Sequence, residues 1–193
     1  MIRNLLIALT LFAFTGFQDS DFFMKLSKAA IDHTNQQVHY DGRYFEIPYP
    51  NGDVPDSIGV CTDVIIRVYR KFGIDLQKLI HEDMVKNKPE YDKRRKTNKL
   101  NASIDHRRTP NMQTFFTRQG AKLNVTSNDA DYKPGDIVFW EVAAGHVGIV
   151  THEKVNGTTR PYIVHNIGSG NKKEDFLYGA EIVGHYRWKP KSQ

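Results

Sequence analysis

The hydrophobic pattern divides the chain into a helical first part and a strand-rich last third. Apolar residues recur every three or four positions over residues 60–72, which predicts a helix with one face in the core, ended by Gly73. The pattern also predicts an earlier helix over residues 21–35 and two later ones, capped by Asp75 and by Asn111. Cys61 therefore falls in the first turn of the helix that begins near residue 60.

The last third contains short runs rich in β-branched and aromatic residues, separated by Gly, Asn and charged turns. The runs cover residues 136–142, 146–152, 161–166 and 182–188. Such runs predict antiparallel strands. Helices first and strands afterwards favour an α+β fold, with the N-terminal helices packed on one side of a C-terminal antiparallel sheet.

The N-terminus has the pattern of an export signal. A start that carries Arg3 precedes an almost unbroken apolar run from Leu5 to Phe17. This run is shorter than the roughly 20 apolar residues that span a bilayer. We therefore expect residues 1–18 to be a signal peptide or N-terminal anchor and residues 19–193 to form a single domain. The expected location is the periplasm or the medium, with membrane contact only through an uncleaved N-terminal segment.

Charge and composition narrow the classes of partner. The chain has 193 residues and a formal net charge of +5, with nine of its Lys and Arg side chains between residues 86 and 108. A run of this kind is common in solvated loops. Tyr91 is the only aromatic residue in it, whereas single-strand nucleic-acid binders interleave basic and aromatic residues. We expect a monomer with no nucleic-acid partner.

Cys61 is the only cysteine, which excludes an internal disulfide and a multi-cysteine metal site. Backbone N–H groups and the dipole at a helix start favour a thiolate, so this position predicts a lowered thiol pKa. A buried, unreactive cysteine is the alternative interpretation. The neighbouring chemistry decides between the two.

Histidines at strand ends favour a reactive thiol. His146 follows Gly145 at the start of a predicted strand, where its imidazole can act as a base for the thiol. Such a base needs a polar group on its far nitrogen. His165 and Asn166 end the next predicted strand, and strand alternation lets only one of them face His146. We predict that His165 does.

Six segments carry a resemblance to a known family. They are Tyr40–Tyr44, Pro48–Asp53, Gly59–Val64, Ile104–Arg108, Pro134–Val138 with Gly145–Val150, and Ile163–Gly168. Over residues 25–188 the chain resembles the bacterial domain-of-unknown-function 1287 family. That family is similar in turn to papain-like cell-wall cysteine hydrolases of the NlpC type. The resemblance implies a papain-like fold without cofactor or metal, in which Cys61, His146 and His165 are catalytic.

The resemblance also implies a substrate, peptidoglycan or its fragments, cut within the stem peptide or at the glycan-peptide amide. Asp63 is a candidate for binding a substrate amine, and Arg107, with Arg108, for binding a carboxylate. A hydroxyl from Tyr49 or Tyr44 could join the N–H of Cys61 in stabilising the oxyanion.

One departure from the NlpC pattern concerns the residue before the cysteine. It is usually acidic in those enzymes, whereas Val60 stands here and Asp63 follows. The resemblance to the NlpC-type enzymes therefore supports the roles of the nucleophile and the base more strongly than it supports the choice of substrate.

Two other functions remain open. A zinc amidase would use histidines from the set His106, His146, His165 and His185, but the segment from His81 lacks the second histidine of a His-Glu-x-x-His helix. A non-catalytic cell-envelope binding module would use the basic loop over residues 86–108.

Overall fold

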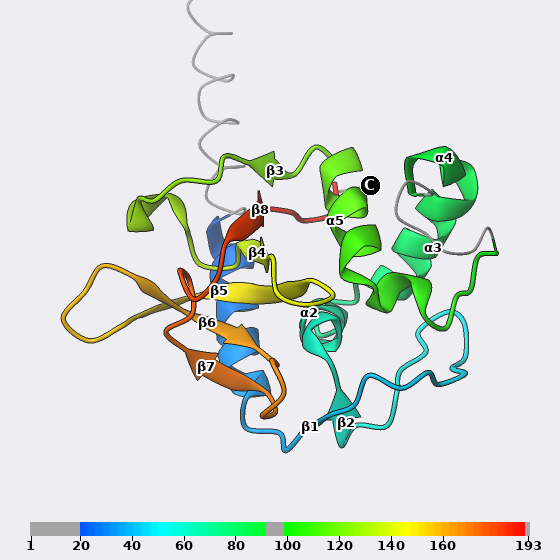
Figure 1. Cartoon of the computed structure of the whole chain (residues 1–193), viewed down its shortest axis with the longest axis horizontal. Helices are drawn as coiled ribbons and strands as arrows, with labels where there is room; N and C mark the ends of the chain where they lie inside the picture. Colours follow the sequence, from blue (N-terminus) through cyan, green and yellow to red (C-terminus); the bar gives the residue numbers. More distant parts are fainter. Residues whose placement is uncertain (1–19, 92–98, 192–193) are drawn as a thin grey trace, which may run out of the picture.

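The computed structural model describes residues 20–91 and 99–191, which form helices, a two-stranded sheet and a six-stranded sheet (Figure 1). The predicted signal or anchor segment, residues 1–18, lies outside the described residues. Within these two ranges, no helix has both the length and the apolar character needed to cross a membrane.

The larger sheet has the strand order β3-β8-β4-β5-β6-β7, and every neighbouring pair is antiparallel. The strands are β3 (Lys122–Leu123), β4 (Ile137–Trp140), β5 (His146–Lys154), β6 (Pro161–His165), β7 (Lys172–Glu174) and β8 (Ile182–Tyr186). The predicted antiparallel sheet is confirmed. The short edge strands β3 and β7 were not predicted, because each has only two or three residues and no buried face to mark it.

The helices are the helix over residues 20–33, α2 (Cys61–Arg70), α3 (Leu76–Lys86), α4 (Lys88–Tyr91) and α5 (Thr109–Arg118), with the 3-10 turns η2 (Asp105–Arg107) and η3 (Asp129–Asp131). Asp75 caps α3 as predicted, because its side chain accepts a hydrogen bond from the N–H of Gln77. The prediction that Asn111 caps α5 is wrong. The helix begins two residues earlier, since Pro110 fits its first turn, and the Asn111 amide donates to the carbonyl of Asp105.

Apolar side chains cover both faces of the sheet. Phe139 and Ile149 belong to a cluster shared with the helix over residues 20–33, α2, α3 and α5. Trp140 and Ile163 belong to a second cluster on the opposite face, closed by loop residues such as Leu177. The helices thus pack on one face of the sheet, and the loops close the other (Figure 1).

A short pair of parallel strands lies next to the start of α2. Strand β1 (His39–Tyr40) pairs with β2 (Ile58–Gly59), and the register sets Tyr40 beside Gly59. Only Val60 separates β2 from α2. Residues distant in sequence therefore meet where Cys61 begins its helix.

Candidate active site

The start of α2 is held by a buried ion pair. The carboxylate of Asp63 accepts a hydrogen bond from the N–H of Val60 at 2.7 Å and two from the Arg107 guanidinium, each at 2.8 Å. Both charged side chains are only 3% exposed. A bidentate pair of this kind restricts the orientation of both partners. It ties the first turn of α2, which contains Cys61, to the η2 segment.

The Cys61 thiol is buried but lies at the edge of a cavity. The residue is 6% exposed and lines a cavity of about 380 Å³ together with Tyr40, Arg108, Thr109 and Gly145. Burial raises the thiol pKa to about 11, although the backbone N–H groups of Val147, Thr62 and Cys61 oppose that rise. The predicted lowering of the thiol pKa is therefore wrong. Loss of hydration outweighs the favourable helix start.

His146 lies at the start of β5, opposite Trp140 of β4. Its Nε2 is 2.8 Å from Nδ1 of His165, and its ring also contacts Trp140 and Phe176. Burial, followed by the repulsion that a protonated His165 would exert, lowers the pKa of His146 to about 3, so the imidazole is neutral. The next residue, Val147, directs its N–H at the Cys61 sulfur. Adjacent residues of β5 therefore contact the thiol and carry the imidazole.

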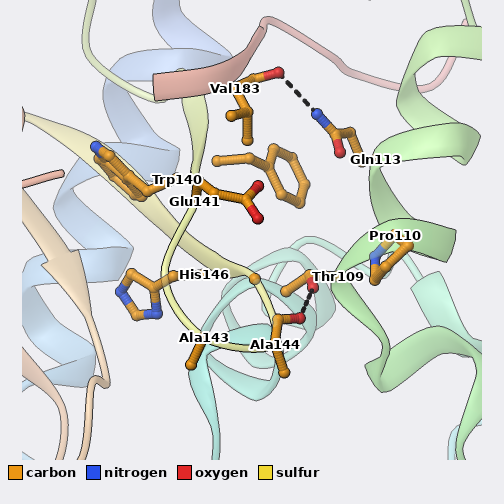
Figure 2. A pocket seen from close by; sticks show the side chains of 11 residues that line it. Thr109, Pro110, Gln113, Trp140, Glu141, Ala143, Ala144, His146 and Val183 are labelled. Atoms are coloured by element: carbon orange, nitrogen blue, oxygen red, sulfur yellow. Dashed lines mark hydrogen bonds between the residues drawn. The ribbon is translucent and has the colours of Figure 1, made fainter. Parts of the chain in front are cut away.

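A second cavity adjoins the first. It measures about 330 Å³ and is lined by His146, Glu141 and Gln113, among others. Figure 2 shows the His146 imidazole at one end of this cavity and Pro110 of α5 at the other. The two cavities share the wall formed by Thr109, Pro110, Ala144 and Gly145. Thr109 donates a hydrogen bond to the carbonyl of Ala144 at 3.1 Å and fixes this wall.

His165, and not Asn166, contacts His146. The Asn166 side chain donates instead to the carbonyl of Gly59, at 3.3 Å. His165 is fully buried, and its Nε2 lies 2.9 Å from Oε2 of Glu174 on β7. Burial lowers the pKa of His165, while the nearby Glu174 carboxylate opposes that shift. The result is a hydrogen-bonded row of three side chains from three neighbouring strands.

The packing of this row depends on Gly148. The strand register pairs Ile149 with Val164, so the preceding residue Gly148 lies beside His165, and it shares a face with His146 two residues away. A Cβ at Gly148 would lie 2.7 Å from Cγ2 of Ile163 and 3.2 Å from Cβ of His165. The absence of a side chain therefore lets β6 approach closely enough for the two imidazoles to meet.

The tyrosine in the Cys61 cavity is Tyr40, not Tyr44 or Tyr49. Tyr49 packs against the ring of His81, and the Tyr44 hydroxyl accepts a hydrogen bond from Asn101. Burial raises the pKa of Tyr40, and the charge of the Asp63 carboxylate adds to the rise, so its hydroxyl keeps its proton. The β1–β2 pairing sets Tyr40 beside the cysteine turn. The sequence offered only a weak signal, a short β-type run that ends in this tyrosine.

The charged candidates separate into paired and unpaired groups. Asp63 and Arg107 neutralise each other, so neither presents a free charge to the cavity. Arg108 is exposed, lines the Cys61 cavity and forms no ion pair within the described part of the chain. The structure thus separates two arginines that are neighbours in sequence.

The remaining histidines of the zinc hypothesis lie in other surroundings. His185 contacts Asp136 at 2.8 Å and the carbonyl of Asn124 at 3.0 Å, and His106 is buried in η2. Across residues 20–91 and 99–191, no group of three or more His, Cys, Asp or Glu side chains has an arrangement that could hold a metal ion.

Comparison with known proteins agrees with the resemblance to the domain-of-unknown-function 1287 family. An Escherichia coli (strain K12) protein, described as uncharacterized protein YijF, is 43% identical over 166 residues, which cover 83% of this chain and 80% of YijF. The family model for the domain of unknown function DUF1287 matches residues 27–188. The chain therefore belongs to the DUF1287 family.

Proposed function

We propose that this protein is an exported cysteine amide hydrolase of the papain-like, NlpC type that cleaves peptidoglycan, within the stem peptide or at the glycan-peptide amide. One observation carries the proposal. The sulfur of Cys61 receives the N–H of Val147, while the adjacent His146 is hydrogen-bonded to His165. A thiol at a helix start, a strand-start imidazole and a third polar group are the parts that thiol-dependent acyl transfer requires.

In the proposed reaction, the Cys61 sulfur attacks the amide carbonyl carbon as His146 accepts the thiol proton. The carbon-nitrogen bond then breaks, and His146 returns that proton to the leaving nitrogen. Water attacks the resulting thioester, gives one proton to His146, and releases the acid as the sulfur is protonated again. Because the thiol pKa is about 11 and the His146 pKa is about 3, both groups begin neutral. Proton transfer therefore accompanies attack instead of preceding it.

Two donors are proposed for the oxyanion: the N–H of Cys61 and the Tyr40 hydroxyl. Tyr40 lines the same cavity as the cysteine and keeps its proton, since its pKa is raised. It replaces Tyr44 and Tyr49 in this role. A preorganised donor of this type contributes about 2.7–4 kcal/mol to transition-state stabilisation.

Substrate recognition is proposed to involve Arg108 instead of Arg107. The Arg107 guanidinium uses two hydrogen bonds on Asp63, whereas Arg108 is exposed at the Cys61 cavity. A free guanidinium can bind a carboxylate through two hydrogen bonds. We therefore assign the carboxylate of the acyl portion of the substrate to Arg108, and we assign Asp63 to holding the helix start.

Digestion of purified sacculi tests the function. We expect the wild-type chain to release soluble fragments, whose masses identify the bond cut, and Cys61→Ala and His146→Ala to release none. His152→Ala is the matched control, because His152 lies on the same strand but contacts Ser27. An active Cys61→Ala variant would refute the proposal. Loss of activity with chelator would favour the zinc amidase, and sacculus binding without turnover by the wild type would favour the binding module.

Export is tested separately. We expect the chain recovered from the periplasm or medium to lack its first residues or to remain anchored by them, and N-terminal sequencing distinguishes these results. Retention of the protein in the cytosol would contradict the proposed location.

A further inference from the structure

We propose that Glu174 is a positioning residue that fixes the tautomers of His165 and His146, so that His146 presents the unprotonated Nδ1 as the base. This inference rests on the proposed function for its catalytic meaning. Its structural content does not, because the positions of two protons can be measured without turnover.

The argument follows the row of hydrogen bonds from β7 inward. The Glu174 carboxylate can only accept, so the hydrogen at its 2.9 Å contact belongs to Nε2 of His165. A neutral imidazole carries one N–H, which leaves Nδ1 of His165 as an acceptor. The 2.8 Å contact between the two rings then needs a hydrogen on Nε2 of His146. The remaining nitrogen of His146, Nδ1, keeps its lone pair.

These proton positions follow only if both imidazole rings are neutral. Burial lowers the pKa of His146 to about 3 and also lowers that of His165. A protonated ring would donate from both nitrogens, and the carboxylate would no longer determine the direction of the second hydrogen bond. With both rings neutral, one acceptor at the end of the row sets every proton in it.

The strand register explains why Glu174 can do this. Glu174 pairs with Ile163 on β6, so it lies on the same face as His165, two residues further along that strand. Its side chain is 40% exposed, whereas His165 is fully buried. The carboxylate therefore stays hydrated while it orders a pair of rings that water does not reach.

The position of Glu174 distinguishes a role in orienting the histidines from a role in binding substrate. Glu174 lines neither the Cys61 cavity nor the adjoining His146 cavity. When His146 becomes cationic during the reaction, the row of hydrogen bonds also connects that charge to a carboxylate. Loss of Glu174 should therefore lower kcat and leave KM nearly unchanged.

Imidazole ¹⁵N chemical shifts of the full chain report the tautomers directly. We expect the wild type to show a protonated Nε2 on both rings, Glu174→Ala to show mixed tautomers, and Glu174→Lys, which replaces the acceptor by a donor, to reverse the pattern. Glu153→Ala is the matched control. Glu153 is a partly exposed carboxylate on β5 that pairs with Lys173, the neighbour of Glu174 in sequence.

Kinetics on solubilised muropeptides supply the second measurement. We expect Glu174→Ala to lower kcat by roughly 10- to 100-fold, which is the range for loss of a charge-assisted hydrogen bond. Glu174→Asp should restore part of the lost kcat. Glu153→Ala should leave kcat unchanged. Wild-type tautomers in Glu174→Ala would overturn the inference. Cys61→Ala should abolish turnover without changing the tautomers. If the wild type hydrolyses no peptidoglycan, the proposed function fails while the ¹⁵N shifts still decide the role of Glu174.

Discussion

The ionisation of Cys61 gives the sharpest test of the reaction as proposed. Burial raises its pKa to about 11, whereas a free cysteine titrates near 8.5. At pH 7 about 0.01% of Cys61 is thiolate, against about 3% of a free thiol, which is roughly a 300-fold difference. The more basic thiolate is intrinsically more nucleophilic, and this raises the alkylation rate of Cys61 by roughly tenfold, which offsets part of the difference. Alkylation at pH 7 should thus be some 20- to 30-fold slower than that of a free thiol.

Alkylation by iodoacetamide from pH 5 to 11 measures this titration. Because Cys61 is the only cysteine, the mass of the intact protein reports one site. We expect the rate to rise continuously through neutral pH towards a midpoint above 10. His146→Ala should leave the midpoint unchanged, since the wild-type imidazole is already neutral. Protein unfolded in urea is the control and should titrate near 8.5.

The opposite result has a distinct form. A pre-formed thiolate-imidazolium pair would give a rate plateau through neutral pH and an acidic midpoint that His146→Ala abolishes. That profile would refute the proposal that Cys61 and His146 are both neutral before the reaction. It would instead support the lowered thiol pKa that the helix start predicts.

Three further predictions concern stability. Arg107→Met leaves the buried Asp63 carboxylate without its partner, so urea denaturation should show a loss of about 3–5 kcal/mol; a loss below about 1 kcal/mol would contradict the ion pair's role. Gly148→Ala should cost about 1–3 kcal/mol by the same assay, because its Cβ would lie 2.7 Å from Cγ2 of Ile163, and an unchanged midpoint would refute that contact. The pKa values of His33 and His146 are lowered to about 4 and about 3, below the usual 6.5, so the unfolded chain binds protons first. Their contribution to stability is fully present above pH 6.5 and is lost progressively as pH falls from 6.5 to about 4 for His33 and to about 3 for His146, by up to about 1.4 kcal/mol per pH unit for each. A melting temperature that stayed constant from pH 7 to 4 would exclude this contribution.

The local pattern of apolar and polar residues was sufficient to predict the helix and strands that carry the reactive groups. The apolar spacing after residue 60 predicted α2 with Cys61 in its first turn. Strand alternation left only one of His165 and Asn166 to face His146, and of these two we predicted His165. Both predictions depend on short-range geometry, the helical repeat and the two-residue strand period. The helix prediction needs no strand pairing, and the His165 prediction assumes only that consecutive strands are neighbours.

Groups that depend on long-range pairing were missed. Glu174 occurs in the run Lys172–Glu174, which reads as a charged turn until β7 pairs with β6. Tyr40 lies near the cysteine only because β1 pairs with β2, although residues 41–57 separate the two strands in the chain. Neither neighbour can be inferred from periodicity, since the pairing is chosen by the whole core.

By itself, the sequence determined the order of helices and strands, the antiparallel character of the sheet, the membership of the DUF1287 family and the presence of a single thiol. Only the tertiary structure decided that Arg107 is neutralised by Asp63, whereas Arg108 has no ion pair with any residue that the structure describes, and that the Cys61 thiol is protonated. Helical and strand periods are local properties of the backbone, whereas the charge state of a side chain depends on the water and partners that distant segments remove or supply.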